Sequence, residues 1–340
     1  MPNNRFLNAL QGKPQKTPPI WLMRQAGRYH SHYQNLKKNF SFEELCKSPQ
    51  LSAETAMGPI EEFDFDVAIL FSDILFPLES LGMNLKYDPG PQFSELLSEQ
   101  NHRKIFSQNN PIQSLSFQAE AIERTIEKLP NDKSMIGFIG GPWTLLSYAM
   151  GKNKINAIDK LSEFEWNIIN DKLIPLLKQN VSMQLEAGAE IVMIFDSAAN
   201  QLNEIDFEKY IRLVFKEIVS NFEKKVGYYA KDGVNYSSIE MIKTELSVPL
   251  AGLGIDSNES LTDFFNPSRK GFIQGNFDEK IMIQPPEIMK ENLDKFIEKI
   301  SSISIEERVG WVCGLGHGVL KTTPEENVKF FVKKIRESFA

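Results

Sequence analysis

The chain carries near its N-terminus the stretch Pro18-Pro19-Ile20-Trp21-Leu22-Met23-Arg24-Gln25-Ala26-Gly27-Arg28. This apolar, strand-like segment ends abruptly in two arginines four residues apart. If the chain turns helically after Met23, both guanidinium groups lie on one face, where like charges are mildly destabilising. Arginines bind carboxylates or phosphates bidentately, and a rigid strand end presents them well. The stretch therefore predicts either an anion-binding strand end or two solvated surface arginines.

Apolar runs of this kind recur along the chain. They occupy residues 19–23, 66–71, 135–140, 190–195, 225–230, 248–254, 271–276 and 311–316. Most are continuously apolar rather than alternating, as expected of parallel strands buried on both faces. Segments with helical periodicity lie between them, for example at residues 43–62, 114–129, 161–187, 207–224 and 287–301. Eight strand–helix units predict an α/β fold, a (β/α)8 TIM barrel with an active-site cleft at the C-terminal ends of its strands.

A doubly wound sheet is the alternative, but its Gly-x-Gly-x-x-Gly turn is missing after the first strand. No composition shift or linker divides the 340 residues, so we expect a single domain over residues 1–340. Residues 84–110 are polar and punctuated by Pro and Gly, which predicts an inserted loop beyond the second strand. Capping boxes at residues 41–44 and 323–326 predict two helix starts.

The charge balance excludes some classes of function. The chain has 38 basic and 45 acidic residues, a net charge of −7, and no dense run of Lys or Arg, so it is not expected to bind nucleic acid. Cys46 and Cys313 stand far apart and make no disulfide framework, which fits a reducing cytoplasm. The N-terminus lacks a hydrophobic signal, and no 18 apolar residues run together. These features predict a soluble, cytoplasmic protein without a membrane partner.

Polar side chains follow several of the predicted strands. In a barrel the C-terminal strand ends converge, and catalytic groups lie there. The side chains in question are Arg24, Arg28, Asp73, Tyr148, Asp196, Ser197, Gln274, Asn276 and His317. Each has a structural alternative: Asp73 as a helix N-cap, Tyr148 as a core tyrosine, Asp196 as a residue that closes a turn, and His317 as a hydrogen-bonded structural histidine. Gln274 and Asn276 could pair only with loop backbone. Their convergence favours a shared site.

Metal and nucleophile chemistry have little support. Of the four histidines, His30 and His32 lie in a polar stretch and His102 in the predicted insertion, which leaves Cys313 and His317 as a close pair of soft ligands. A catalytic zinc needs three protein ligands. No Gly-x-Ser-x-Gly elbow and no P-loop occur. The sequence therefore predicts an anion-binding site around one acidic group, without a metal.

Five motifs stand in order over almost the whole chain. They are residues 19–28; Phe71-Ser72-Asp73-Ile74-Leu75; residues 137–144 followed by Tyr148; Gln274-Gly275-Asn276; and residues 316–320 followed by 323–328. In these motifs the chain closely resembles the uroporphyrinogen decarboxylase family. It departs from the family pattern at residues 196–200, which lack a glycine, and at Ser257, where many relatives have tryptophan.

The resemblance implies a reaction and a set of site residues. The substrate would be uroporphyrinogen III, whose four acetates lose CO2 to give coproporphyrinogen III, with no metal and no organic cofactor, in a homodimer. The implied catalytic residues are Asp73, Arg24 and Arg28. The implied substrate-binding residues are Arg24, Gln25, Ala26, Arg28, Asp73, Tyr148, Ser197 and His317.

Two rival hypotheses remain at this point. Zinc-dependent methyltransferases that act on corrinoids or folate resemble the same family in fold, but they need a His/Cys zinc set. A tetrapyrrole-binding protein without catalysis would be expected to have lost Asp73 or one of the arginines, and the chain retains them.

Overall fold

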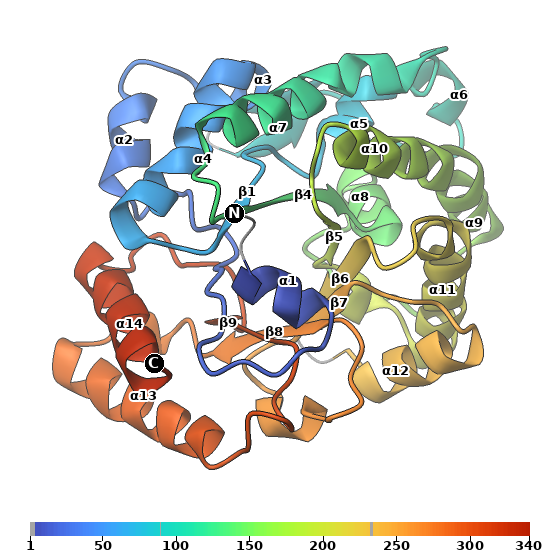
Figure 1. Cartoon of the computed structure of the whole chain (residues 1–340). Coiled ribbons are helices and arrows are strands. Elements are labelled where there is room, and N and C mark those ends of the chain that lie inside the picture. Colours follow the sequence, from blue (N-terminus) through green and yellow to red (C-terminus); the bar gives the residue numbers. More distant parts are fainter. Residues whose placement is uncertain (1–3, 89, 232–233) are drawn as a thin grey trace.

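Seven parallel strands form one curled sheet in the computed structural model, which describes residues 4–88, 90–231 and 234–340 (Figure 1). In spatial order they are β1 (Val67–Ile69), β4 (Ser134–Gly140), β5 (Val192–Asp196), β6 (Val226–Ala230), β7 (Gly252–Gly254), β8 (Phe272–Phe277) and β9 (Trp311–Leu315). Nearly every strand residue is buried, as in sheets covered on both faces. Seven of the eight predicted strands are confirmed.

The predicted strand at residues 19–23 is not a strand but an isolated parallel bridge between Ile20 and Cys313. The Trp21 N–H donates to the Cys313 carbonyl at 3.1 Å, and on the other side the Asp66 N–H donates to the Ile20 carbonyl at 3.0 Å. The segment thus lies between β9 and the residue before β1. A longer ladder cannot begin here because Pro18 and Pro19 have no N–H to donate. The eight-stranded barrel is therefore confirmed only as a curled, seven-stranded parallel α/β sheet.

Helices surround the sheet (Figure 1). They are α1 (Asn4–Leu10), α2 (Ser31–Lys37), α3 (Phe42–Lys47), α4 (Pro49–Phe63), α5 (Phe76–Ser80), α6 (His102–Ile105), α7 (Ser116–Lys128), α8 (Pro142–Ala149), α9 (Glu163–Ile168), α10 (Ile174–Glu186), α11 (Glu204–Glu217), α12 (Tyr236–Glu245), α13 (Pro286–Ser301) and α14 (Glu325–Ser338). The predicted helix at 43–62 is broken at Ser48, which caps α4, because Pro49 starts a new helix more readily than it continues an old one. The helix at 161–187 contains a π turn at Ile169–Leu173.

One of the two predicted capping boxes forms. The Ser41 hydroxyl accepts from the Glu44 N–H at 3.2 Å, and the Glu44 carboxylate accepts from the Ser41 N–H at 2.7 Å. The box at residues 323–326 is wrong. Helix α14 starts one residue later than predicted, so Pro324 is the N-cap and the Thr323 hydroxyl is buried without a partner.

The predicted loop at residues 84–110 is also wrong, since it contains an antiparallel hairpin of β2 (Leu85–Tyr87) and β3 (Pro91–Phe93), followed by α6. Pro89, between the two strands, lies outside the described residues. In β2 the side chains of Leu85 and Tyr87 pack inward while Lys86 is exposed, the alternation typical of a half-buried strand. The hairpin therefore carries an aromatic side chain toward the body of the protein.

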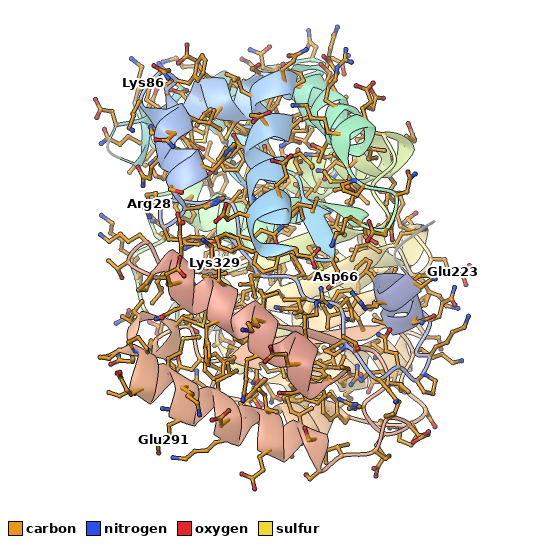
Figure 2. The ribbon with its side chains drawn as sticks, turned by 60° about the vertical axis from the view of Figure 1, so that its left-hand side comes forward. Arg28, Asp66, Lys86, Glu223, Glu291 and Lys329 are labelled. Carbon is orange, nitrogen blue, oxygen red and sulfur yellow. The ribbon has the colours of Figure 1, made fainter. Side chains whose placement is uncertain are left out.

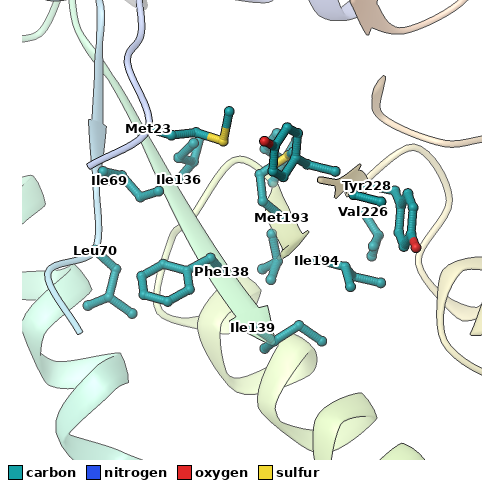
Figure 3. Close-up of a cluster of buried hydrophobic side chains, with 14 of the residues drawn as sticks. Met23, Ile69, Leu70, Ile136, Phe138, Ile139, Met193, Ile194, Val226 and Tyr228 are labelled. Carbon is teal, nitrogen blue, oxygen red and sulfur yellow. The ribbon is translucent and has the colours of Figure 1, made fainter. Parts of the chain in front are cut away.

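The inside of the sheet is filled by side chains from successive strands (Figure 3). Met23, Ile69, Ile136 and Met193 are all buried there. In the part of the chain that the structure describes, no helix is long and apolar enough to cross a membrane.

A buried carboxylate ties together the end of the sheet where the strands begin. Asp66, just before β1, accepts from the Ile20 N–H at 2.7 Å and from Arg5 at 3.0 Å, and it pairs with Arg336 at the end of α14. Figure 2 shows Asp66 well separated from Arg28, which lies near the start of α14. This end of the molecule is thus held by charge pairs inside the protein.

Candidate active site

The arginine segment forms two consecutive turns rather than a helical turn. The Gln25 N–H donates to the Leu22 carbonyl at 3.1 Å, and the His30 N–H donates to the Gly27 carbonyl at 3.0 Å. Arg24 has a left-handed backbone with φ of 60°, which interrupts any right-handed helix. The expectation that Arg24 and Arg28 share a helical face is therefore wrong, although both side chains are exposed.

Gln25 anchors these turns to β1. Its side chain is fully buried, and its amide group donates to the Val67 carbonyl at 2.9 Å while its oxygen accepts from the Leu22 N–H at 3.3 Å. The Tyr29 hydroxyl donates to the Gln25 carbonyl at 2.7 Å. The side-chain amide of Gln25 is thus used within the protein to fix the arginines in place, and its contact with a substrate stays a prediction.

The arginine segment lies against the chain that follows β9. The Val319 N–H donates to the Met23 carbonyl at 2.9 Å. A Cβ atom on Gly318 would lie 2.5 Å from Cδ of Arg24, so the glycine makes room for the arginine stem. The half-buried His317 stands next to this contact, and its Nδ1 lies 3.1 Å from the Gly318 carbonyl oxygen. Two residues from distant motifs, Arg24 and His317, are therefore placed on adjoining segments.

Asp73 follows β1 and is half-buried. Its Oδ1 accepts from the Leu75 N–H at 2.9 Å, an Asx turn, and α5 is capped by Leu75, so the alternative that Asp73 is a helix N-cap is wrong. Burial raises the pKa of the Asp73 carboxyl, while the Leu75 N–H, the Tyr87 hydroxyl and the Arg24 guanidinium oppose that rise. The structure thus brings Arg24 close enough to act on Asp73.

Tyr87 is a neighbour of Asp73 that sequence reasoning missed. It comes from the hairpin, and its ring packs on Phe42 and Phe76, with centroid distances of 4.8 and 6.0 Å. Its hydroxyl is buried and close enough to Asp73 for each group to shift the pKa of the other, but the geometry of a hydrogen bond is not met. The signal in the sequence was the Leu85-Lys86-Tyr87 alternation.

Asp196, at the end of β5, is a fully buried carboxylate inside a network of hydroxyls. It accepts from Thr144 at 2.6 Å, Tyr210 at 2.6 Å and Tyr228 at 3.1 Å. Burial raises its pKa, and these hydroxyls oppose the rise. The Thr144 hydroxyl in turn accepts from the Ala198 N–H at 2.9 Å, which ties α8 to the chain after β5. Asp196 is therefore a buried structural carboxylate, although it binds three distant hydroxyls rather than closing a turn as the alternative stated.

The other predicted residues divide into those that bond to the backbone inside the protein and those that are partly accessible. Gln274 donates to the Leu315 carbonyl at 3.3 Å, and Asn276 donates to the carbonyls of Asp256 and Glu259 at 2.7 and 2.8 Å, as expected of residues that pair with loop backbone. Ala26 in the arginine turns, Tyr148 on α8 and Ser197 after β5 are half-buried, so part of each residue is accessible.

An aromatic row crosses three neighbouring strands near these groups. Phe138 of β4 and Phe195 of β5 have ring centroids 5.6 Å apart, and Phe195 lies 6.2 Å from Tyr229 of β6. The Tyr229 hydroxyl donates to the Gly316 carbonyl at 2.9 Å, just before His317. Sequence reasoning missed this row, although its members lie within continuous apolar runs.

Comparison with known proteins decides among the hypotheses. The family model described as "Uroporphyrinogen decarboxylase (URO-D)" matches residues 1–338. The chain belongs to the uroporphyrinogen decarboxylase family. A uroporphyrinogen decarboxylase from Orientia tsutsugamushi is 33% identical over 345 residues, covering 98% of each chain. One from Myxococcus xanthus is 34% identical over 352 residues, covering 98% of this chain and 96% of the relative. Family membership makes the chain a carboxy-lyase.

Two solved structures share the fold. A methyltransferase from Methanosarcina mazei superposes with a TM-score of 0.70 at 19% identity, covering 99% of this chain and 98% of its own. A putative vitamin-B12 independent methionine synthase from Listeria monocytogenes gives a TM-score of 0.53 at 10% identity, covering 95% and 98%. At these identities the likeness concerns the fold alone, so it does not favour the methyltransferase hypothesis over membership of the uroporphyrinogen decarboxylase family.

The residues proposed for a zinc site do not form one. Within residues 4–88, 90–231 and 234–340, no group of three or more His, Cys, Asp or Glu side chains could hold a metal ion. Cys313 is buried in β9, and burial raises the pKa of its thiol, which disfavours the thiolate that zinc requires. Two surface clefts, one beside Lys290 and one beside Lys243, include none of the predicted site residues in their lining. The cleft above Asp73 stays a prediction.

Proposed function

We propose that the chain decarboxylates uroporphyrinogen III to coproporphyrinogen III with Asp73 as its central catalytic group. The observation that carries this proposal is the half-buried carboxylate after β1, with Arg24 acting on it from the adjoining turn. For each acetate, a proton adds to the pyrrole α-carbon, the bond between methylene and carboxylate breaks, and CO2 leaves. The electrons of the broken carbon–carbon bond pass into the protonated pyrrole ring. Protonation of the methylene then gives a methyl group, and the α-carbon gives up its proton.

Asp73 suits the cationic ring that forms in this sequence. With one oxygen held by the Leu75 N–H, the carboxylate keeps acceptor sites for the converging pyrrole N–H groups of a domed macrocycle. A negative charge fixed in a partly dry site favours the cation more than the neutral substrate, so it lowers the barrier rather than only tightening binding.

Arg24 and Arg28 would bind the carboxylates of the substrate. Both side chains are exposed and supply fork-shaped donors, which match carboxylates bidentately. Because a guanidinium does not give up its proton in proteins, we assign them to clamping charge rather than to routine proton donation. They also offset the net charge of −7 at the point where a polyanionic substrate approaches.

The remaining residues would position the macrocycle. Tyr148, Ser197 and His317 expose polar groups to it, Gln25 and Ala26 present the arginine turns, and the aromatic row from Phe138 to Tyr229 supplies apolar surface. The reaction would need neither a metal nor an organic cofactor, because the protonated pyrrole itself accepts the electrons.

We also propose a single barrel domain over residues 1–340, in which residues 19–23 take the eighth position. The hydrogen bonds of this segment toward Cys313 on one side and Asp66 on the other support that arrangement. We further propose a cytoplasmic homodimer, and the free, buried Cys46 and Cys313 fit a reducing compartment. Light scattering after gel filtration tests the dimer: a mass near twice 38.8 kDa is expected, and a monomer contradicts it.

The direct test is anaerobic incubation of the purified protein with uroporphyrinogen III, followed by chromatography. Coproporphyrinogen III and released CO2 are expected. Unchanged substrate from folded protein would overturn the proposal. Zinc is measured on the same sample, since stoichiometric zinc together with inactivity would favour the methyltransferase hypothesis.

A further inference from the structure

We propose that Tyr87 is a positioning residue for Asp73. In this role the Tyr87 hydroxyl donates a hydrogen bond to the Asp73 carboxylate oxygen that Leu75 leaves free. The inference rests on the proposed role of Asp73. It assigns a task in the reaction to the β2–β3 hairpin, which lies outside the main sheet.

The placement of the Tyr87 ring is the first observation. Phe42, the first residue of α3, and Phe76, the first residue of α5, hold the ring from two elements, with centroids at 4.8 and 6.0 Å. Pairing of β2 with β3 fixes the backbone behind it. The ring therefore has little freedom, and its hydroxyl is directed into buried surroundings.

The unpartnered hydroxyl is the second observation. The Tyr87 oxygen is buried without a hydrogen bond, a state that buried polar groups rarely keep because it forfeits their hydration. Asp73 lies beside it with one oxygen engaged by Leu75. The hydroxyl is a donor without an acceptor, and the carboxylate is an acceptor with a free oxygen, so the two groups complement each other. If Tyr87 served only to fill the core, phenylalanine would fit the same aromatic contacts without the buried hydroxyl.

The charges around the pair fix which group donates. Burial raises the pKa of the Tyr87 hydroxyl, and the nearby Asp73, Cys46 and Glu79 raise it further, so the hydroxyl stays protonated. Burial and Asp73 likewise raise the pKa of the Cys46 thiol. Tyr87 can therefore donate to the Asp73 carboxylate. Tyr87 and Arg24 favour the ionised form of the Asp73 carboxyl, whereas its burial favours the neutral form.

The test is Tyr87→Phe, which keeps the ring and removes the donor. The acid limb of the pH profile of kcat/KM should move to higher pH, and kcat near neutrality should fall roughly tenfold with KM little changed. The melting temperature should change little, because the aromatic contacts with Phe42 and Phe76 are kept. A purely structural role would leave the acid limb where it is.

A second readout does not depend on turnover. In protein labelled with 13C at the aspartate carboxyl carbons, the Asp73 signal, assigned by its loss in Asp73→Asn, should titrate at higher pH in Tyr87→Phe than in the unmodified protein. Tyr236→Phe is the matched control. It also removes a buried hydroxyl, one that donates to the Ala230 carbonyl, and it should leave the Asp73 titration unchanged.

The outcomes separate the inference from the proposed function. If Asp73→Asn is inactive but Tyr87→Phe shifts neither the acid limb nor the carboxyl titration, the positioning role is wrong and the role of Asp73 stands. If Asp73→Asn retains full activity, the proposed function of Asp73 fails, while a shifted titration in Tyr87→Phe would still establish the contact.

Discussion

Asp73 and Asp196 both follow parallel strands of one sheet, yet the protein holds them in opposite ways. Asp196 is fully buried and accepts three hydroxyl hydrogen bonds of 2.6–3.1 Å. Asp73 is half-buried and accepts one backbone hydrogen bond of 2.9 Å from Leu75. Burial raises the pKa of both carboxyls. What differs is therefore the number of acceptor sites that remain for a ligand.

That difference separates a structural carboxylate from one that is available for chemistry. The hydroxyls of Thr144 on α8, Tyr210 on α11 and Tyr228 on β6 donate to Asp196, which is fully buried, so nothing outside the protein can reach it. Asp73 retains acceptor capacity, and the exposed Arg24 guanidinium acts to lower its pKa. Substitutions at the two positions should therefore affect different quantities: rate at Asp73, and stability at Asp196.

The largest effect on rate is expected for Asp73→Asn. The substitution keeps the shape of the side chain and removes its charge, so kcat should fall roughly a hundredfold to a thousandfold, as for loss of one preorganised catalytic group. The Leu75 N–H keeps an acceptor, so the melting temperature should change little. Anaerobic turnover and thermal melting measure both. Near-normal CO2 release by the folded variant would remove Asp73 from the mechanism.

The largest effect on stability is expected for Asp196→Ala. Thr144, Tyr210 and Tyr228 would lose their common acceptor in a fully buried site, so the free energy of unfolding should fall by about 3 kcal/mol or more. Denaturant unfolding measures the loss. Wild-type stability would show that the hydroxyls find other partners, and the contrast with Asp73 would then lose its basis.

Arg28→Ala should lower kcat/KM by at least roughly tenfold, because an exposed guanidinium that clamps substrate carboxylates is removed. Arg124→Ala is the matched control, since Arg124 is an exposed arginine on α7 that pairs with Glu127 at 2.9 Å. Unfolding should be unaffected in both variants. Equal kcat/KM values for the two would contradict the clamp, and the site would then depend on Arg24 alone.

The strands of the sheet could be predicted because parallel strands that are buried on both faces consist of continuous apolar residues. The prediction of strands failed where apolarity and the backbone preferences of proline point to different structures, and where strands are short. Residues 19–23 have the apolarity of a strand, but two prolines and the left-handed Arg24 limit them to a bridge. The β2–β3 hairpin has strands of only three residues, too short for alternation to stand out among Pro and Gly.

For the site, sequence reasoning selected Asp73 and Arg24 because strand ends converge in this class of fold, and their roles stay predictions. It could not say that Asp196 is saturated, since its donors come from residues 144, 210 and 228 and meet only in the folded chain. Nor could it find Tyr87, whose approach to Asp73 depends on the packing of the hairpin against Phe42 and Phe76. Sequence motifs indicate which side chain is a candidate catalytic group, whereas the residues around it depend on tertiary packing.

The smallest effect concerns how Asp196 couples stability to pH. Its folded pKa is raised above the unfolded value of about 3.9, so its contribution to stability is fully present below that value and is lost as pH rises through the folded pKa. Asparagine has no such proton to lose. The stability difference, wild type minus Asp196→Asn, should therefore decline as pH rises from about 4. It should then level off. Denaturant midpoints at a series of pH values measure this slope. A difference that rises with pH would mean that the three hydroxyls stabilise the carboxylate more than burial opposes it, which would make Asp196 the permanently charged member of the pair.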